Sequence, residues 1–66
     1  METGIVKFYN HSAKCGFITP SGGSKDVFFK ESNVIGEMVS NGDQVEYEIG
    51  KGEKGDEAKN IRKVGS

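Results

Sequence analysis

Two short β-type runs and the turn between them decide the fold: residues 15–30 read CGFITPSGGSKDVFFK. The first run, Cys15–Thr19, is closed by Pro20, and the second run is Asp26–Lys30. Residues 21–24, two serines and two glycines, lie between them and are typical of a turn. The sequence therefore predicts a β-hairpin at this point of the chain.

Three further strands are predicted outside this hairpin: Thr3–Asn10, Gln44–Gly50 and Ala58–Val64. In the middle one of these, Val45, Tyr47 and Ile49 alternate with two glutamates, which predicts one buried and one solvated face. Residues 31–41 are interpreted as a loop with one short helical turn, and residues 50–56 as a second loop. Five short strands with a long connection between the third and the fourth predict an all-β fold that closes into a small barrel, because closure removes exposed strand edges.

Composition limits what else the chain can be. With 66 residues we expect a single domain, 1–66, that buries only about 60% of the surface of its unfolded chain. One cysteine, Cys15, and one histidine, His11, make neither a disulfide nor a structural zinc site. A Cys–His nucleophile would lack a third, orienting group, so we predict no enzyme activity, no metal and no cofactor. The sequence has no membrane-length apolar run and no signal peptide, which indicates the cytoplasm.

Charge is distributed unevenly along the chain, although the net charge is only −1. Residues 1–30 carry four lysines and two acidic residues, a balance of +2, whereas residues 31–66 carry five basic and eight acidic residues, a balance of −3. The positive balance coincides with the part of the chain that holds the phenylalanines. The net charge therefore conceals a basic and aromatic segment.

Strand register predicts which of these side chains face solvent. If Ile18 points inward, Cys15 and Phe17 share the outer face of their strand. If Val27 and Phe29 point inward, Phe28 and Lys30 lie on the same outer face, within reach of Lys7 and Phe8. Solvent-facing phenylalanines ringed by lysines are typical of surfaces that stack bases and hold phosphates of single strands. The alternative is that the phenylalanines form the core, in which case Ile18, Val27 and Phe29 would be exposed instead.

The chain resembles the bacterial cold-shock proteins and the cold-shock domain over essentially its whole length. The residues that carry the resemblance are Gly4, Val6, Lys7, Asn10, Gly16-Phe17-Ile18, Asp26-Val27-Phe28, Gly42, Val45, Gly55 and Asn60-Ile61. The resemblance implies a five-stranded antiparallel barrel of the OB type. It also implies binding of single-stranded DNA and RNA with low sequence specificity, and a role as a nucleic-acid chaperone or regulator of gene expression.

The chain departs from the family's pattern on the same surface. Cys15 stands where the first motif has an aromatic residue, and Lys30 and Glu31 replace the usual histidine and phenylalanine of the second. The usual tryptophan of the first strand is Phe8. Because each stacked base contributes roughly 1–3 kcal/mol, and because Glu31 repels phosphate, we predict weaker binding over fewer bases.

The predicted nucleic-acid-binding residues form three groups. Rings for stacking are Phe8, Phe17 and Phe28, ammonium groups for phosphates are Lys7, Lys14 and Lys30, and supporting residues are Tyr9 and Asn10. The expected partner is single-stranded DNA or RNA, with no membrane and no small-molecule substrate, and the chain is expected to be a monomer with an adventitious dimer through Cys15. The alternative is an interaction or structural module whose nucleic-acid face has been lost.

Overall fold

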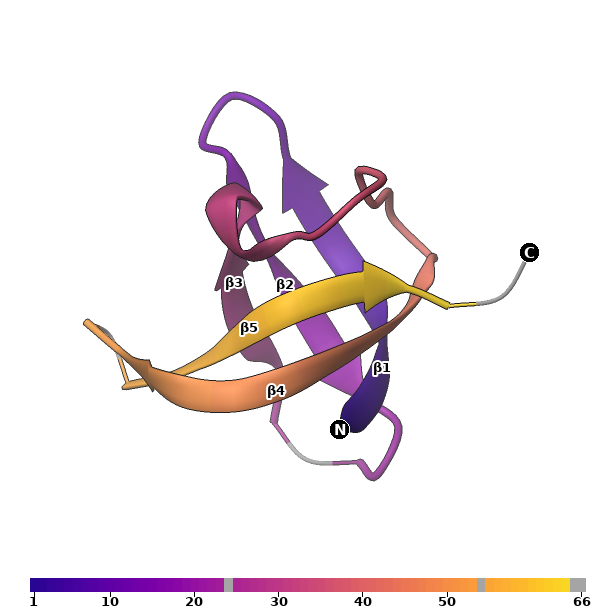
Figure 1. The fold of residues 1–66 in the computed structure, drawn as a ribbon, viewed down its shortest axis with the longest axis vertical. Helices are drawn as coiled ribbons and strands as arrows, with labels where there is room; N and C mark the ends of the chain where they lie inside the picture. Colours follow the sequence, from indigo (N-terminus) through magenta and orange to yellow (C-terminus); the bar gives the residue numbers. More distant parts are fainter. Residues whose placement is uncertain (24, 54, 65–66) are drawn as a thin grey trace.

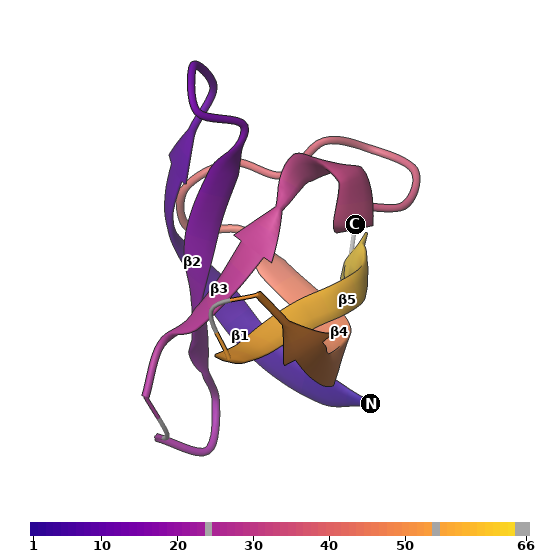
Figure 2. The ribbon, with the colours of Figure 1, turned by 90° about the vertical axis from the view of Figure 1, so that its left-hand side faces the viewer.

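Five strands form a closed barrel in the computed structural model, which describes residues 1–23, 25–53 and 55–64 (Figure 1). One turn of 3-10 helix, η1 (Glu31–Asn33), follows the third strand (Figure 2). The strands are β1 (Glu2–Asn10), β2 (Cys15–Pro20), β3 (Val27–Lys30), β4 (Gln44–Gly52) and β5 (Gly55–Lys63). The predicted β-hairpin is confirmed as β2 and β3, while residue 24 of its turn lies outside the described residues.

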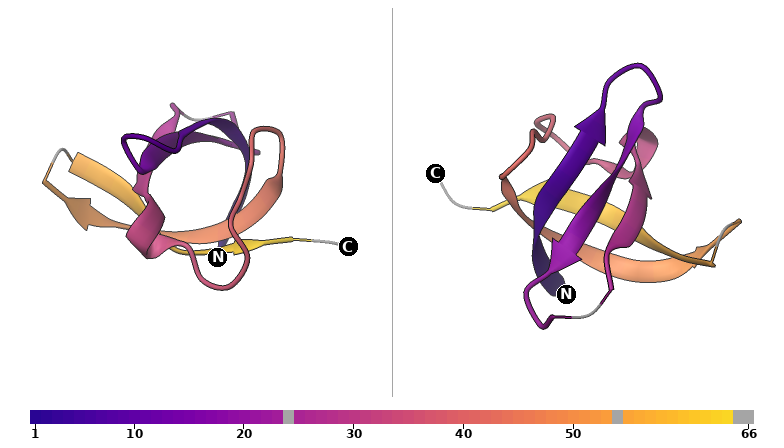
Figure 3. Two further views of the ribbon diagram at one scale, coloured as in Figure 1. Left: turned by 90° about the horizontal axis from the view of Figure 1, so that it is seen from above. Right: turned by 180° about the vertical axis from the view of Figure 1, so that it is seen from behind.

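The order of strands around the barrel is β1-β2-β3-β5-β4, and β4 pairs with β1 to close the ring. The ring is visible from above in the left view of Figure 3. Four of the neighbouring pairs are antiparallel, but β3 and β5 are parallel. The prediction of a purely antiparallel barrel is therefore wrong at this one pair. Strand directions cannot alternate all the way round a ring with an odd number of members, so one parallel pair is required.

The β4–β5 hairpin is longer than the sequence predicts. The sequence predicts a loop over residues 50–56, but β4 extends to Gly52, which pairs with Gly55 at the start of β5. Gly55 has a φ of 110°, a conformation that suits glycine at a tight reversal. Residue 54 lies outside the described residues. The prediction fails here because strand pairing uses backbone groups, and these charged residues and glycines can pair without contributing to a core.

This hairpin projects beyond the barrel as a two-stranded arm (Figures 1 and 3). Val45 and Tyr47 are buried as the alternation predicts, but Ile49 is 47% exposed, so its predicted inward position is wrong. The β4–β5 pairing shifts register between Glu46 and Glu48. Beyond the shift, Ile49 lines an open hollow together with Tyr47 and Val27.

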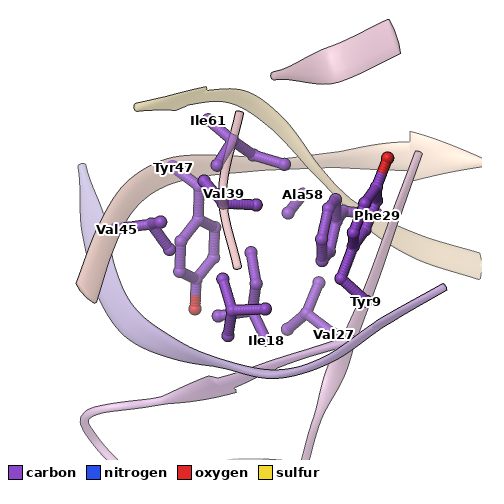
Figure 4. Close-up of a cluster of buried hydrophobic side chains, with 10 residues drawn as sticks. Tyr9, Ile18, Val27, Phe29, Val39, Val45, Tyr47, Ala58 and Ile61 are labelled. Atoms are coloured by element: carbon purple, nitrogen blue, oxygen red, sulfur yellow. The ribbon is translucent and has the colours of Figure 1, made fainter. Parts of the chain in front are cut away.

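The core fills the barrel with one set of inward residues from each strand and one from the long connection (Figure 4). The inward register of Ile18, Val27 and Phe29 is confirmed. Tyr9 stacks on Phe29 with ring centroids 5.9 Å apart. Val39 is fully buried although it belongs to a segment predicted as loop, and it packs among the other core side chains. The buried hydrophobic residues are Val6, Tyr9, Ile18, Val27, Phe29, Val39, Val45, Tyr47, Ala58 and Ile61.

Candidate nucleic-acid interface

Three phenylalanines lie in one row across β1, β2 and β3. Phe17 is the register partner of Phe8 on one side and of Phe28 on the other. Phe8 is 47% and Phe17 is 42% exposed, and Phe28 is partly buried. The rings of Phe17 and Phe28 meet edge to face with centroids 5.8 Å apart. We call these three side chains the phenylalanine row; they form an apolar surface of the kind that marks binding sites.

An irregularity in β1 brings Phe8 to this surface. Val6 pairs with Ile18 and Phe8 pairs with Phe17, so β1 has one more residue than β2 at this point. Such a β-bulge leaves the additional residue outside the regular alternation. Lys7 and Phe8 are therefore both exposed, although they are consecutive, while Val6 and Tyr9 on either side are buried.

Lysines surround the phenylalanine row, as the sequence predicts, but two of them already have carboxylate neighbours. Lys7 Nζ lies 2.9 Å from Asp26 Oδ2, and Lys30 Nζ lies 4.0 Å from a carboxylate oxygen of Glu53. Hydrogen bonds from Lys7 and from the Thr19 hydroxyl lower the pKa of Asp26, so this carboxylate remains charged. These ion pairs are exposed and therefore weak, and phosphates can compete for both ammonium groups.

Lys14 reaches the surface from the turn between β1 and β2. Its φ is 58°, a left-handed conformation, and its backbone N–H donates to the Asn10 carbonyl at 2.8 Å. Asn10 Oδ1 accepts from the backbone N–H groups of Ser12 and Ala13 at 2.9 and 3.0 Å. Side chains of this type stabilise tight turns by local hydrogen bonds. Asn10 thus shapes the turn that presents Lys14.

Tyr9 lies in the core beneath this surface. It is only 6% exposed, so it packs inside the barrel and has no face free for a base. Its hydroxyl donates to Glu31 Oε2 at 2.5 Å, and this bond is the first cause that raises the pKa of Tyr9 to about 12. His11 lies edge-on against the same ring, with centroids 4.7 Å apart.

Two hollows flank the phenylalanine row, and Phe28 lines both. The first, about 690 Å³, lies between the row and the β4–β5 arm, where Ile49 forms part of its wall. The second, about 470 Å³, has Lys14, Cys15, Lys30 and Glu31 around it. Sequence reasoning missed Ile49, because plain alternation predicted it to be buried, and it missed the bond between Tyr9 and Glu31.

Neither a metal cluster nor a membrane-spanning helix is found in the part of the chain that the structure describes. Residues 1–23, 25–53 and 55–64 contain no group of three or more histidine, cysteine or acidic side chains placed to hold a metal ion. Within the same ranges no helix has the length and apolar character needed to cross a membrane.

The closed five-stranded barrel and its aromatic, lysine-ringed outer face define a small nucleic-acid-binding barrel of the OB class. The family model described as 'Cold-shock' DNA-binding domain matches residues 2–64. The chain belongs to this family, which confirms the resemblance found in the sequence, and nucleic-acid binding is the function of the family.

Curated relatives agree with this assignment. The cold shock-like protein CspC of Buchnera aphidicola is 48% identical over 61 residues, which cover 88% of each chain. The cold shock-like protein CspC of Escherichia coli K12 is 44% identical, covering 92% of this chain and 93% of the relative. The cold shock-like protein CspA of Stigmatella aurantiaca is 42% identical, covering 97% and 98%.

A solved structure shows the same fold. The structure titled drosophila Unr CSD456 superimposes with a TM-score of 0.82 over 97% of this chain, at 20% sequence identity. The present chain spans about a quarter (26%) of that longer chain. At this identity the likeness concerns the fold alone, and it agrees with the all-β barrel predicted from the sequence.

Proposed function

We propose that this chain binds single-stranded DNA or RNA across the phenylalanine row, with low sequence specificity, and acts as a nucleic-acid chaperone or regulator of gene expression. The observation that carries the proposal is the direct pairing of Phe8, Phe17 and Phe28 across three neighbouring strands. Unpaired bases stack on rings of this kind regardless of their identity. Lys7, Lys14 and Lys30 are assigned to the phosphates.

Binding of this type acts on nucleic-acid structure without chemistry. A protein that binds the open strand and not the duplex shifts the equilibrium towards the open strand by mass action. The rings come from strands of a closed barrel, so little conformational freedom is lost when a strand docks. We accordingly assign no catalytic step and no cofactor. We propose that residues 1–66 act as one monomeric domain in the cytoplasm. Cys15 would allow an adventitious dimer through a disulfide between two chains.

The second candidate is a barrel that serves as an interaction module and no longer binds nucleic acid. The observation that favours it is the replacement of two family rings by Cys15 and Glu31 on the same surface. The exposed positions of Phe8 and Phe17 weigh against it, since a surface without a ligand does not require exposed rings.

The two candidates are separated by titration of an oligothymidine of seven nucleotides at low salt, followed by amide chemical shifts. Our proposal predicts saturable shifts confined to β1, β2, β3 and the turn that holds Lys14. Three lysine–phosphate contacts predict a slope of log K against log salt of about −2, at roughly 0.7 per phosphate. Lys14→Gln should reduce this slope by about 0.7, whereas Lys63→Gln, on a lysine paired with Asp43 at the end of β5, should leave it unchanged. A lack of saturable shifts up to millimolar oligonucleotide would support the interaction module instead.

A further inference from the structure

The smaller hollow, of about 470 Å³, combines groups that suit one particular base. It lies where β2 begins, beside the end of β3 and η1, and its charged wall consists of Lys14, Lys30 and Glu31. Phe28 forms an apolar wall of the same hollow. Its volume falls within the range of small-molecule sites, which also combine apolar walls with a few fixed polar groups.

Glu31 is held in place by three hydrogen bonds. Its backbone N–H donates to the Lys14 carbonyl at 2.9 Å, and its own carbonyl accepts from the Val34 N–H at 3.0 Å. Its carboxylate accepts from the Tyr9 hydroxyl through Oε2 at 2.5 Å. Tyr9 is itself fixed by packing in the core against Phe29. The carboxylate is therefore a preorganised acceptor, and preorganisation lowers the cost of binding a ligand.

The carboxylate retains capacity for further hydrogen bonds. An ionised carboxylate has about four acceptor positions on its two oxygens. Among the described residues, Tyr9 is the one hydrogen-bond partner of this group, and Oε1 has none. Glu31 is only partly buried and lines the hollow, so these acceptor positions are available to a ligand there.

We infer that Glu31 makes this hollow a guanine-selective subsite of the single-strand-binding surface, an inference that rests on the proposed function. The Watson–Crick edge of guanine presents O6 as an acceptor followed by two adjacent donors, N1–H and the N2 amino group. A carboxylate accepts both donors with its two oxygens, and the ammonium group of Lys14 or Lys30 donates to O6. Lysine is an established donor to guanine O6 in protein–DNA complexes.

The other bases fit this wall less well. Adenine and cytosine each place an acceptor beside their single amino donor, and thymine and uracil place a carbonyl on both sides of their one N–H. A carboxylate opposite any of these edges faces at least one lone pair and leaves a polar group unmatched, which is costly in a recognition site. Bases that are unstacked from a single strand expose this edge, so it is open to readout. Selectivity at this one position is compatible with sequence-tolerant stacking on the phenylalanine row.

The test compares three heptanucleotides that differ only at the central base: thymine, guanine, or hypoxanthine introduced as inosine. Hypoxanthine differs from guanine in lacking the N2 amino group. Dissociation constants are measured by calorimetric titration, with the amide shifts of Lys30 and Glu31 as a local readout. We expect the guanine oligonucleotide to bind about tenfold more tightly than oligothymidine, within the range of one bidentate pair. Inosine should lose a large part of this gain.

Glu31→Gln is the critical variant, because its amide oxygen can still accept from the Tyr9 hydroxyl while one carboxylate acceptor becomes a donor. We expect the guanine preference to fall to within about twofold, while oligothymidine binding stays equal or becomes tighter as repulsion of phosphate is removed. Glu53→Gln is the matched control, since it removes a carboxylate near Lys30 that is 91% exposed. This control should retain the preference.

The outcomes separate this inference from the proposed function. If oligothymidine binds the phenylalanine row but guanine gives no gain, or if Glu31→Gln keeps the full gain, the guanine subsite is refuted and the proposed function stands. If Glu31→Gln only lowers the melting temperature, with the preference unchanged, Glu31 serves to hold Tyr9 and the inference is also refuted. If none of the three oligonucleotides binds, both fail together.

Discussion

Replacement of Phe17 by alanine tests the phenylalanine row at its centre. Phe17 pairs with Phe8 and with Phe28 and is 42% exposed, so its loss interrupts the row without opening the core. Stacking of one base on a ring is worth roughly 1–3 kcal/mol, so the loss of one ring should raise the dissociation constant about 5- to 150-fold. The edge-to-face contact with Phe28 contributes about 0.5–1.5 kcal/mol to folding, in addition to the apolar area that Phe17 buries. Stability should therefore fall together with affinity, and both are measured on the same samples.

Calorimetric titration with an oligothymidine of seven nucleotides measures the affinity, and thermal unfolding of the same samples measures the stability. Ile35→Ala is the matched control: Ile35 is also 42% exposed, but it follows η1 and its N–H bonds to Ile61 of β5. We expect this control to bind within about twofold of the unchanged chain, because it removes a similar apolar surface outside the row. If Phe17→Ala binds as tightly as Ile35→Ala, the row is not the binding surface.

Two further predictions concern the barrel that presents this surface. Gly16→Ala should lower the free energy of unfolding by about 1–3 kcal/mol, because a β-carbon there would lie 2.2 Å from the carbonyl oxygen of Phe8. Gly22→Ala is the control, since open space surrounds that position. Equal denaturant midpoints for the two variants would contradict the close approach at Gly16. The pKa of Tyr9, raised to about 12 in the folded state from the usual 10, predicts a stability that is complete below pH 10 and declines as the pH rises towards 12. Burial raises the pKa of Tyr47 in the same direction, so Tyr9→Phe should reduce the alkaline decline without abolishing it, and denaturant midpoints at pH 9 and pH 11 measure the difference.

The sequence predicts the β2–β3 hairpin and its register well, because each of these strands has inward residues that only one alternation can bury. With Ile18, Val27 and Phe29 inside, Phe17 and Phe28 had to face outward, and the structure has this arrangement. Irregular pairing is harder to predict. Simple alternation from Val6 would bury Phe8, and only the bulge against β2 brings it to the surface.

The remaining differences follow from contacts between distant segments. The exposure of Ile49 depends on where β4 leaves the barrel, which is a property of the whole ring and not of the local pattern. The bond from Tyr9 to Glu31 joins residues 22 positions apart and has no local signal. A parallel pair, in contrast, follows from the odd number of strands once closure is assumed, whereas its position between β3 and β5 follows from the order of strands around the ring.

The additional residue in β1 has a consequence for the spacing of groups on the surface. In a regular strand, two side chains on one face are separated by two residues, or about 6.6–6.8 Å along the strand. The bulge instead exposes Lys7 and Phe8 from consecutive residues, whose α-carbons are about 3.8 Å apart. A cation and a ring thus project side by side from one short segment, close enough for both to meet the phosphate and the base of a single nucleotide.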